Sequence, residues 1–132
     1  MGINEGILVF PLEDRLSCNE DENLFLANFE GFSIISMGNI QDIKDDVERI
    51  LKPLGKKVYT IINYQNFTIH PELFDPYPDM VKNLVDELYS GVSRYTTSTF
   101  YRMKIEEALK ERNVVPHIYE TLAEASQALK KM

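Results

Sequence analysis

Apolar residues recur at the spacing of an amphipathic helix in several parts of this chain. The clearest pattern covers 40–54, where one helical face would carry Ile40, Ile43, Val47, Ile50, Leu51 and Leu54. Asn39 precedes this run and is a suitable N-cap, and the helix dipole favours Asp42 in the first turn. Gly55 follows the run, and glycine commonly ends a helix. The pattern therefore predicts a helix over 40–54.

The same spacing predicts three further helices. One covers 79–89, with an apolar face of Met80, Val81, Leu84, Val85 and Leu88. Another covers 99–112, with a packed side of Phe100, Met103, Ile105, Ala108 and Leu109. The last begins with a capping box over 121–124, in which the side chains of Thr121 and Glu124 satisfy backbone N–H groups reciprocally. Its expected buried face is Leu122, Ala125 and Leu129.

Short apolar runs alternate with these helices and predict strands at 24–29, 58–64, 92–96 and 114–119. The run 58–64 contains no charged residue, which is typical of a central strand covered on both faces. Alternating strands and helices imply parallel strands joined by right-handed crossovers. We therefore expect the α/β class, with a mixed sheet of four to six strands and helices in βαβαβα order.

The N-terminal residues are less regular. Residues 7–10 form a brief apolar run before Pro11 and predict an edge strand or an extended arm. Residues 13–23 are acidic and polar and predict a loop, while 32–35 predict either a hairpin arm or an extended connection. No linker divides the remainder. We expect an N-terminal segment over 1–23 and a single α/β domain over 24–132.

The formal net charge of −7 narrows the expected partners. Nucleic acid and anionic membranes are recognised by basic surfaces, so neither is expected as a partner. No apolar run approaches the length of a membrane span, and no signal peptide is expected. The single cysteine, Cys18, excludes an intrachain disulfide and fits a cytoplasmic protein. Nearby carboxylates predict a raised thiol pKa and an unreactive Cys18.

The junction between the strand 92–96 and the following helix carries the candidate chemistry. Its side chains are Arg94, Tyr95, Thr96, Thr97 and Ser98. The first turn of a helix has unpaired N–H groups and a partial positive charge, so with a guanidinium and hydroxyls it is suited to an anion. Ligands of open α/β sheets bind beyond the carboxyl ends of strands, where another strand would add Asn63, Tyr64 and Asn66. The competing interpretation is a capped helix without a ligand.

Other residues offer less support for chemistry. His70 and His117 are the only histidines, and either is a candidate general base near neutral pH. Neither has a cysteine or a second histidine at ligand spacing, so no metal is expected. The sequence contains no glycine-rich phosphate loop, so no nucleotide cofactor of the usual kind is expected.

Several segments resemble the extra C-terminal domain of some bacterial acyl-CoA:acetate/3-ketoacid CoA transferases. They are 59–67, 89–98 and 115–120, with 10–15 and 28–31 similar to the same region. In those enzymes a glutamate of the catalytic domains attacks the thioester. Nothing in this chain resembles the glycine-rich neighbourhood of that glutamate, so the resemblance implies an accessory domain and no catalytic residue.

The order of elements is also similar to the STAS fold of anti-sigma-factor antagonists. Those proteins carry a phosphorylatable serine after the central strand, whereas residues 63–68 here read Asn-Tyr-Gln-Asn-Phe-Thr. The likeness therefore implies a fold and no phosphorylation switch.

The leading expectation is a non-catalytic accessory or binding domain that acts with CoA-transferase-type enzymes. Its partners would be CoA-transferase catalytic domains or further copies of this chain, and its ligand a small anion. Two alternatives stay open: a small enzyme that uses His70 or His117 as its base, and a purely structural interaction or dimerisation domain.

Overall fold

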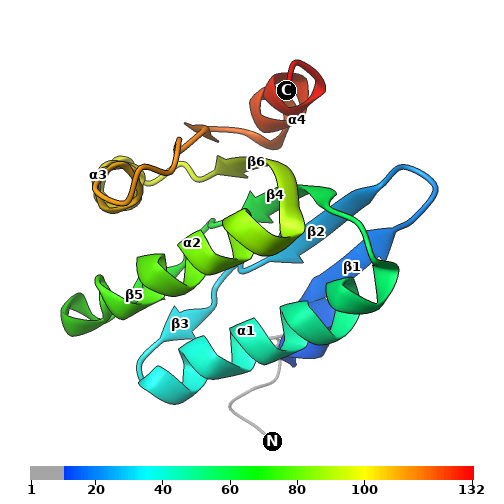
Figure 1. Ribbon diagram of the computed structural model, residues 1–132. Coiled ribbons are helices and arrows are strands. Elements are labelled where there is room, and N and C mark those ends of the chain that lie inside the picture. Colours follow the sequence, from blue (N-terminus) through cyan, green and yellow to red (C-terminus); the bar gives the residue numbers. More distant parts are fainter. Residues whose placement is uncertain (1–10) are drawn as a thin grey trace, which may run out of the picture.

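A five-stranded mixed sheet forms the centre of the computed structural model, which describes residues 11–132. The strand order is β1-β2-β4-β6-β7, and the bounds are Leu16–Asn19 (β1), Leu24–Asn28 (β2), Val58–Asn63 (β4), Tyr89–Tyr95 (β6) and Ile118–Tyr119 (β7) (Figure 1). β1 pairs with β2 antiparallel, and the other neighbours are parallel. The expected α/β class with a mixed sheet is confirmed.

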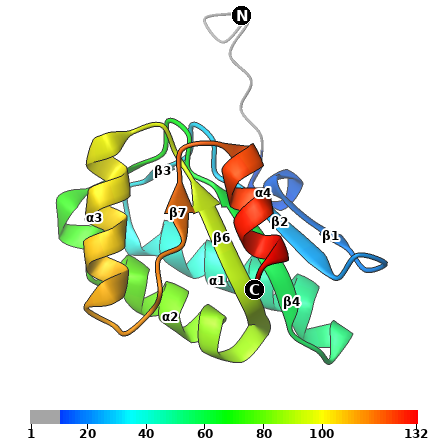
Figure 2. The ribbon, with the colours of Figure 1, turned by 90° about the horizontal axis from the view of Figure 1, so that it is seen from above.

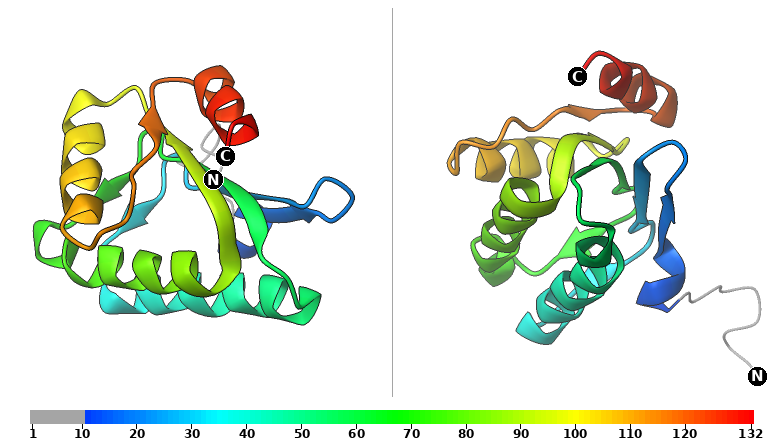
Figure 3. Two further views of the ribbon diagram at one scale, coloured as in Figure 1. Left: turned by 45° about the horizontal axis from the view of Figure 1, so that its top comes forward. Right: turned by 45° about the vertical axis from the view of Figure 1, so that its right-hand side comes forward.

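Helices cover the two faces of this sheet unequally. α1 (Met37–Leu51) and α2 (Pro76–Leu88) lie on one face, and α4 (Leu122–Lys130) lies on the other (Figures 1 and 2). α3 (Thr99–Lys110) lies beside α2, near the β7 edge of the sheet (Figure 3). Because α4 is the only described helix on its face, part of β2 is left uncovered there, and Leu26 is 40% exposed.

Smaller elements complete the described chain. β3 (Ser33–Ile34) and β5 (Thr68–Ile69) form a separate two-stranded parallel sheet. Three short 3₁₀ helices are η1 (Leu12–Arg15), η2 (Lys52–Leu54) and η3 (Pro71–Leu73). Gly55 ends η2 with a left-handed φ of 67°, which glycine adopts without steric cost. None of the helices within residues 11–132 has the length and apolar character needed to cross a membrane.

The central strand β4 was predicted correctly. It lies between β2 and β6, and Val58, Thr60, Ile61 and Ile62 are buried. Successive residues of a strand point to opposite faces, so the core forms on both sides of β4. The main core lies between the sheet and α1 and α2, while Ser93 of β6 donates to the Ala125 carbonyl of α4 on the other side, at 2.7 Å.

Several predictions about local structure were wrong. The predicted loop over 13–23 contains η1 and β1, because β1 pairs with β2 in a hairpin. The first helix begins three residues earlier than expected, with Ser36 as its N-cap and Asn39 inside its first turn. The arm predicted at 7–10 lies outside the described residues.

The apolar side of α3 was also assigned incorrectly. Phe100 and Met103 are 59% and 63% exposed, whereas Ile105 and Leu109 are buried as expected. On α4, Ala125 is buried, but Leu122 is 51% exposed. Each of these two helices buries a narrower face than its apolar pattern suggested.

Candidate functional site

The structure divides the predicted site between the two faces of the sheet. Arg94 and Tyr95 are consecutive residues of β6, so their side chains point to opposite faces. Tyr95 lies on the α4 face, in register with Asn63 of β4 and, beyond it, Asn28 of β2. Arg94 faces the α2 side and is fully buried. The eight predicted residues therefore do not form one pocket.

The polar residues at the carboxyl ends of the strands bond mainly to one another. Asn63 donates from Nδ2 to Asn28 Oδ1 at 3.1 Å and to Glu30 Oε1 at 3.2 Å. Its Oδ1 accepts from the Gln65 backbone N–H at 2.8 Å. Burial, followed by the Glu30 charge, raises the pKa of Tyr95, and a hydrogen bond with Asn63 opposes this rise. This network stabilises the strand ends.

The hydroxyl groups at the start of α3 are all engaged in hydrogen bonds within the fold. Ser98 is the N-cap, and its Oγ accepts from the Tyr101 N–H at 3.2 Å. Thr96 Oγ1 accepts from the Ser98 N–H at 3.1 Å. The N–H and hydroxyl of Thr97 both donate to Gln65 Oε1 at 2.9 Å. The capping interpretation, left open by the sequence, accounts for the Ser98 hydroxyl, while Thr96 bonds within the turn before α3 and Thr97 bonds to Gln65.

Asn66 has a structural position. It is exposed and adopts a left-handed φ of 54° in the turn after β4, a conformation that asparagine tolerates better than most residues. The turn is closed by a hydrogen bond from the Phe67 N–H to the Tyr64 carbonyl at 3.2 Å.

Arg94 is the unusual member of the predicted set. Its Nη1 donates to the Pro116 carbonyl at 2.6 Å, and its backbone N–H donates to the His117 carbonyl at 2.8 Å. Within residues 11–132, no group accepts a hydrogen bond from its Nε or Nη2. It also takes part in none of the ion pairs formed by the described residues. A buried guanidinium with unpaired donors is energetically costly.

Three buried tyrosines surround this charge. The hydroxyls of Tyr64 and Tyr77 lie 2.7 Å apart, and both rings are fully enclosed, as is that of Tyr89. Burial raises the pKa of each phenol, and the nearby Arg94 charge opposes that rise in all three. Tyr64 is close enough to interact with Arg94, but its oxygen does not meet Nε or Nη2 at hydrogen-bond geometry.

A surface groove borders β6, and its lining includes Val92, which points to the same face of the sheet as Arg94. This β6 groove has a volume of about 380 Å³, and its lining includes Tyr89, Val92, Val114 and His117. Val92 precedes Arg94 by two residues, a separation of about 6.6 Å along a strand. Burial first, and then the Arg94 charge, lowers the pKa of His117. The electrostatic influence of Arg94 therefore reaches a residue that lines the groove.

Sequence reasoning missed Tyr77, although the pattern contained a signal for it. Tyr77 extends the buried face of α2 at helical spacing from Met80, Val81 and Leu84. Prolines at 76 and 78 suggested an irregular passage, yet proline is well tolerated in the first turn of a helix. The predicted helix consequently began too late to include this residue.

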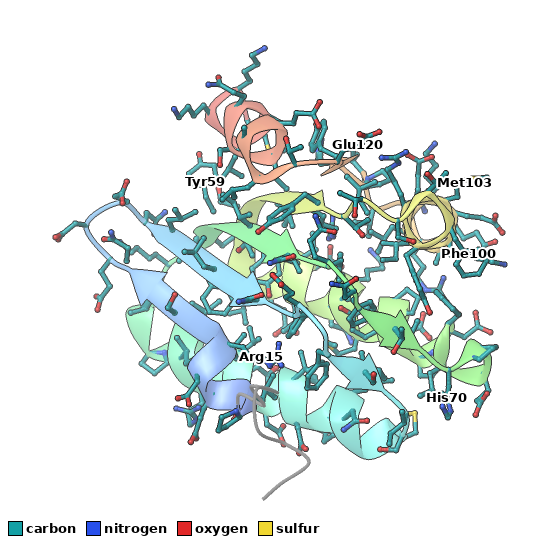
Figure 4. All side chains as sticks on the ribbon, turned by 180° about the vertical axis from the view of Figure 1, so that it is seen from behind. Arg15, Tyr59, His70, Phe100, Met103 and Glu120 are labelled. Carbon is teal, nitrogen blue, oxygen red and sulfur yellow. The ribbon has the colours of Figure 1, made fainter. Side chains whose placement is uncertain are left out.

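The two histidines do not form an evident catalytic centre. His70 is exposed at the start of η3, and its Nδ1 lies 3.5 Å from Glu72 Oε1 (Figure 4). His117 has a left-handed φ of 42° and lies beside β7. Within the described part of the chain, no group of three or more His, Cys, Asp or Glu side chains is placed to hold a metal ion. Burial and Glu20 raise the pKa of Cys18, as predicted.

A scan against protein-family models, a search of curated proteins and a search of solved structures each found no match to this chain. The likeness to CoA-transferase accessory domains and to STAS domains therefore stays a prediction.

Proposed function

We propose that this chain is a non-catalytic binding domain whose ligand presents a carboxylate or phosphate group to Arg94. The observation that carries this proposal is the pair of unpaired donors, Nε and Nη2, on a fully buried guanidinium. These two nitrogens form one edge of the planar group, and their N–H bonds run side by side. Such an edge matches the two oxygens of a carboxylate or phosphate in a bidentate hydrogen bond.

The energetics support an anion at this position. A buried charge that lacks a partner is strongly destabilising. In a bidentate pair, the hydrogen bonds and the attraction of the opposite charge offset much of the free energy that the guanidinium lost on leaving water. The bond from Nη1 to Pro116 uses the other side of the guanidinium, so an anion at the Nε edge leaves it intact. The phenols of Tyr64 and Tyr77 supply further polar groups nearby.

The ligand would approach through the β6 groove. Its wall includes the segment 113–117, where Asn113 and His117 both adopt left-handed conformations that are uncommon for residues other than glycine. Displacement of this segment would open a path from Val92 to Arg94. A carboxylate or phosphate attached to a larger ligand would then reach the guanidinium while the rest of the ligand occupies the groove.

Removal of the guanidinium should abolish stabilisation by small anions. We expect the melting temperature (Tm) of the wild type to rise with the concentration of acetate or phosphate, measured by circular dichroism at constant ionic strength with chloride as the reference anion, because a monatomic ion cannot form a bidentate pair. A ligand that binds only the folded state stabilises it in this way. In Arg94→Met the rise should vanish, because the apolar side chain retains the volume without the donors.

Arg102→Met is the matched control, because Arg102 forms a more exposed ion pair with Glu120 at 3.2 Å and its loss changes the net charge equally. This variant should respond to anions like the wild type. In chloride alone, Arg94→Met should lose no more than about 1 kcal/mol of unfolding free energy, the value of one hydrogen bond. An equal anion response in Arg94→Met and wild type, or a loss of several kcal/mol in chloride, would contradict the proposal.

The association with CoA-transferase-type enzymes remains a hypothesis based on the sequence, and it makes a separate prediction. The isolated chain, incubated with an acyl-CoA and acetate, should show no thioester exchange above the uncatalysed background. In those enzymes a glutamate attacks the thioester, and nothing in this sequence resembles the glycine-rich neighbourhood of that glutamate. Exchange that disappears in Glu30→Gln, at the carboxyl end of β2, would show instead that the chain is itself an enzyme.

A further inference from the structure

The outer side of α3 carries large apolar side chains that the fold does not use. Phe100 is 59% exposed and Met103 is 63% exposed, and both lie on the outer part of α3 (Figure 4). The ring of Phe100 packs edge-on against Tyr101 at 5.2 Å, and Tyr101 stacks with Phe74 at 6.5 Å. An aromatic row therefore extends from the core to the surface at this helix.

This aromatic row borders a groove between α3 and the segment that contains η3. The groove, here called the α3 groove, has a volume of about 440 Å³, and Pro71, Phe74, Phe100 and Ala108 form its apolar surface. Phenylalanine and methionine are enriched in protein interfaces, where rigid aromatic side chains serve as anchors. The α3 groove thus has the surface character of a protein-binding site.

The rim of the α3 groove is mainly acidic. It carries Asp75, Glu107 and Glu111 against the single basic residue Lys104. Asp75 pairs with Arg112 at 3.1 Å, and Glu111 lies 3.7 Å from the same guanidinium. Glu107 forms no ion pair with any residue of the described chain. With Arg112 and Lys104 counted, the three carboxylates leave one negative charge in excess, and the exposed Glu107, which has no ion-pair partner among the described residues, favours a basic occupant.

We propose that the α3 groove docks a basic amphipathic segment of a partner protein. An apolar side chain of that segment packs against Phe74 and Phe100, and its Lys or Arg residues face Glu107 and Glu111. This is the helix-in-groove mode of recognition, in which apolar anchors set the position and charges set the register. The interaction is independent of an anion at Arg94.

Two comparisons within the molecule favour this occupant. A second copy of the chain would bring the same acidic rim against itself in a two-fold interface, which like charges disfavour. A second groove of about 500 Å³, between β2 and α4, carries one acidic and one basic side chain, Glu22 and Lys130, so its charge selects no basic partner.

The test uses synthetic helical peptides of Leu and Lys, about four turns long, with Leu on one face. Titrated into the ¹⁵N-labelled full chain, this peptide should shift backbone resonances of α3 and η3. A peptide with Glu in place of Lys, and a Leu/Lys peptide of scrambled order, should bind at least tenfold more weakly. Equal binding of either control peptide, or shifts spread over other acidic surfaces, would overturn the proposal.

Substitutions in the protein test whether the Leu/Lys peptide binds at the α3 groove. Phe100→Ser and Glu107→Lys should each weaken binding of the Leu/Lys peptide at least tenfold, and both positions are exposed, so folding should be retained. The matched controls are Leu122→Ser on α4 and Asp42→Lys on α1, which make comparable changes at exposed positions elsewhere. Controls that weaken binding as much as the groove variants would show nonspecific attraction and overturn the proposal.

Discussion

Alkaline pH should unfold this domain steeply, with the free energy of unfolding falling by up to about 4 kcal/mol per pH unit above pH 10. Tyr64, Tyr77 and Tyr89 are fully buried, and burial is the largest cause of the raised pKa of each. In the unfolded chain a tyrosine ionises near pH 10. Below about pH 10 these phenols are neutral in both the folded and the unfolded chain, so their full contribution to the free energy of unfolding is present.

The sign follows from proton binding. Above pH 10 the unfolded chain releases protons that the folded chain retains, so stability falls as pH rises toward the folded pKa values. Each proton that the folded chain retains lowers the free energy of unfolding by about 1.4 kcal/mol per pH unit, so three retained protons lower it by about 4 kcal/mol per pH unit. A domain of ordinary stability, about 5–15 kcal/mol, cannot remain folded far into this range.

Urea unfolding at successive pH values between 9 and 12, followed by circular dichroism, measures this slope. Tyr89→Phe should reduce it by one proton, since the phenyl ring keeps the packing and cannot ionise. The matched control for Tyr89→Phe is Tyr119→Phe, which makes the same substitution at a partly exposed position of β7. A wild-type slope of one proton or less would show that the three phenols ionise without unfolding.

Replacement of Phe25 by alanine should cost about 3–5 kcal/mol of unfolding free energy. Phe25 is fully buried on β2, where it belongs to the main core and lies 6.3 Å from the ring of Tyr89. Alanine would leave a cavity in the main core, because the flanking strand and helix cannot close over it. Urea denaturation at neutral pH measures the loss.

The next residue along β2 provides the control. Leu26 points to the opposite face and is 40% exposed beside α4. Leu26→Ala should cost about 1 kcal/mol, because the side chain loses little buried area and leaves no sealed cavity. Equal losses at the two positions would contradict the assignment of the main core to the α1 and α2 face.

The sequence contained enough information for much of the local structure. The helical face from Ile40 to Leu51 and the uncharged strand β4 follow from periodicity and burial, which depend on neighbouring residues. Thr121 and Ser98 cap their helices as hydroxyl residues usually do, with N–H donors three residues ahead. The predicted pocket, however, combined Arg94 and Tyr95, although consecutive residues of a strand point to opposite faces.

Long-range contacts decided the rest. That β1 is a strand depends on its pairing with β2, because its short polar sequence has little preference of its own. Phe100 is exposed because no described element covers the outer side of α3, and helical spacing cannot say which apolar side chains will be covered.

For the candidate site too, some features follow from the sequence and others depend on the tertiary structure. The sequence by itself determined that an arginine would lie near the end of a strand and that hydroxyl residues would begin the next helix. Only the tertiary structure brought Tyr77 and Pro116 to Arg94 and left Nε and Nη2 without a partner among the described residues. The physical reason is that pairing of a buried charge depends on groups distant in sequence, whose approach is set by the packing of whole helices and strands.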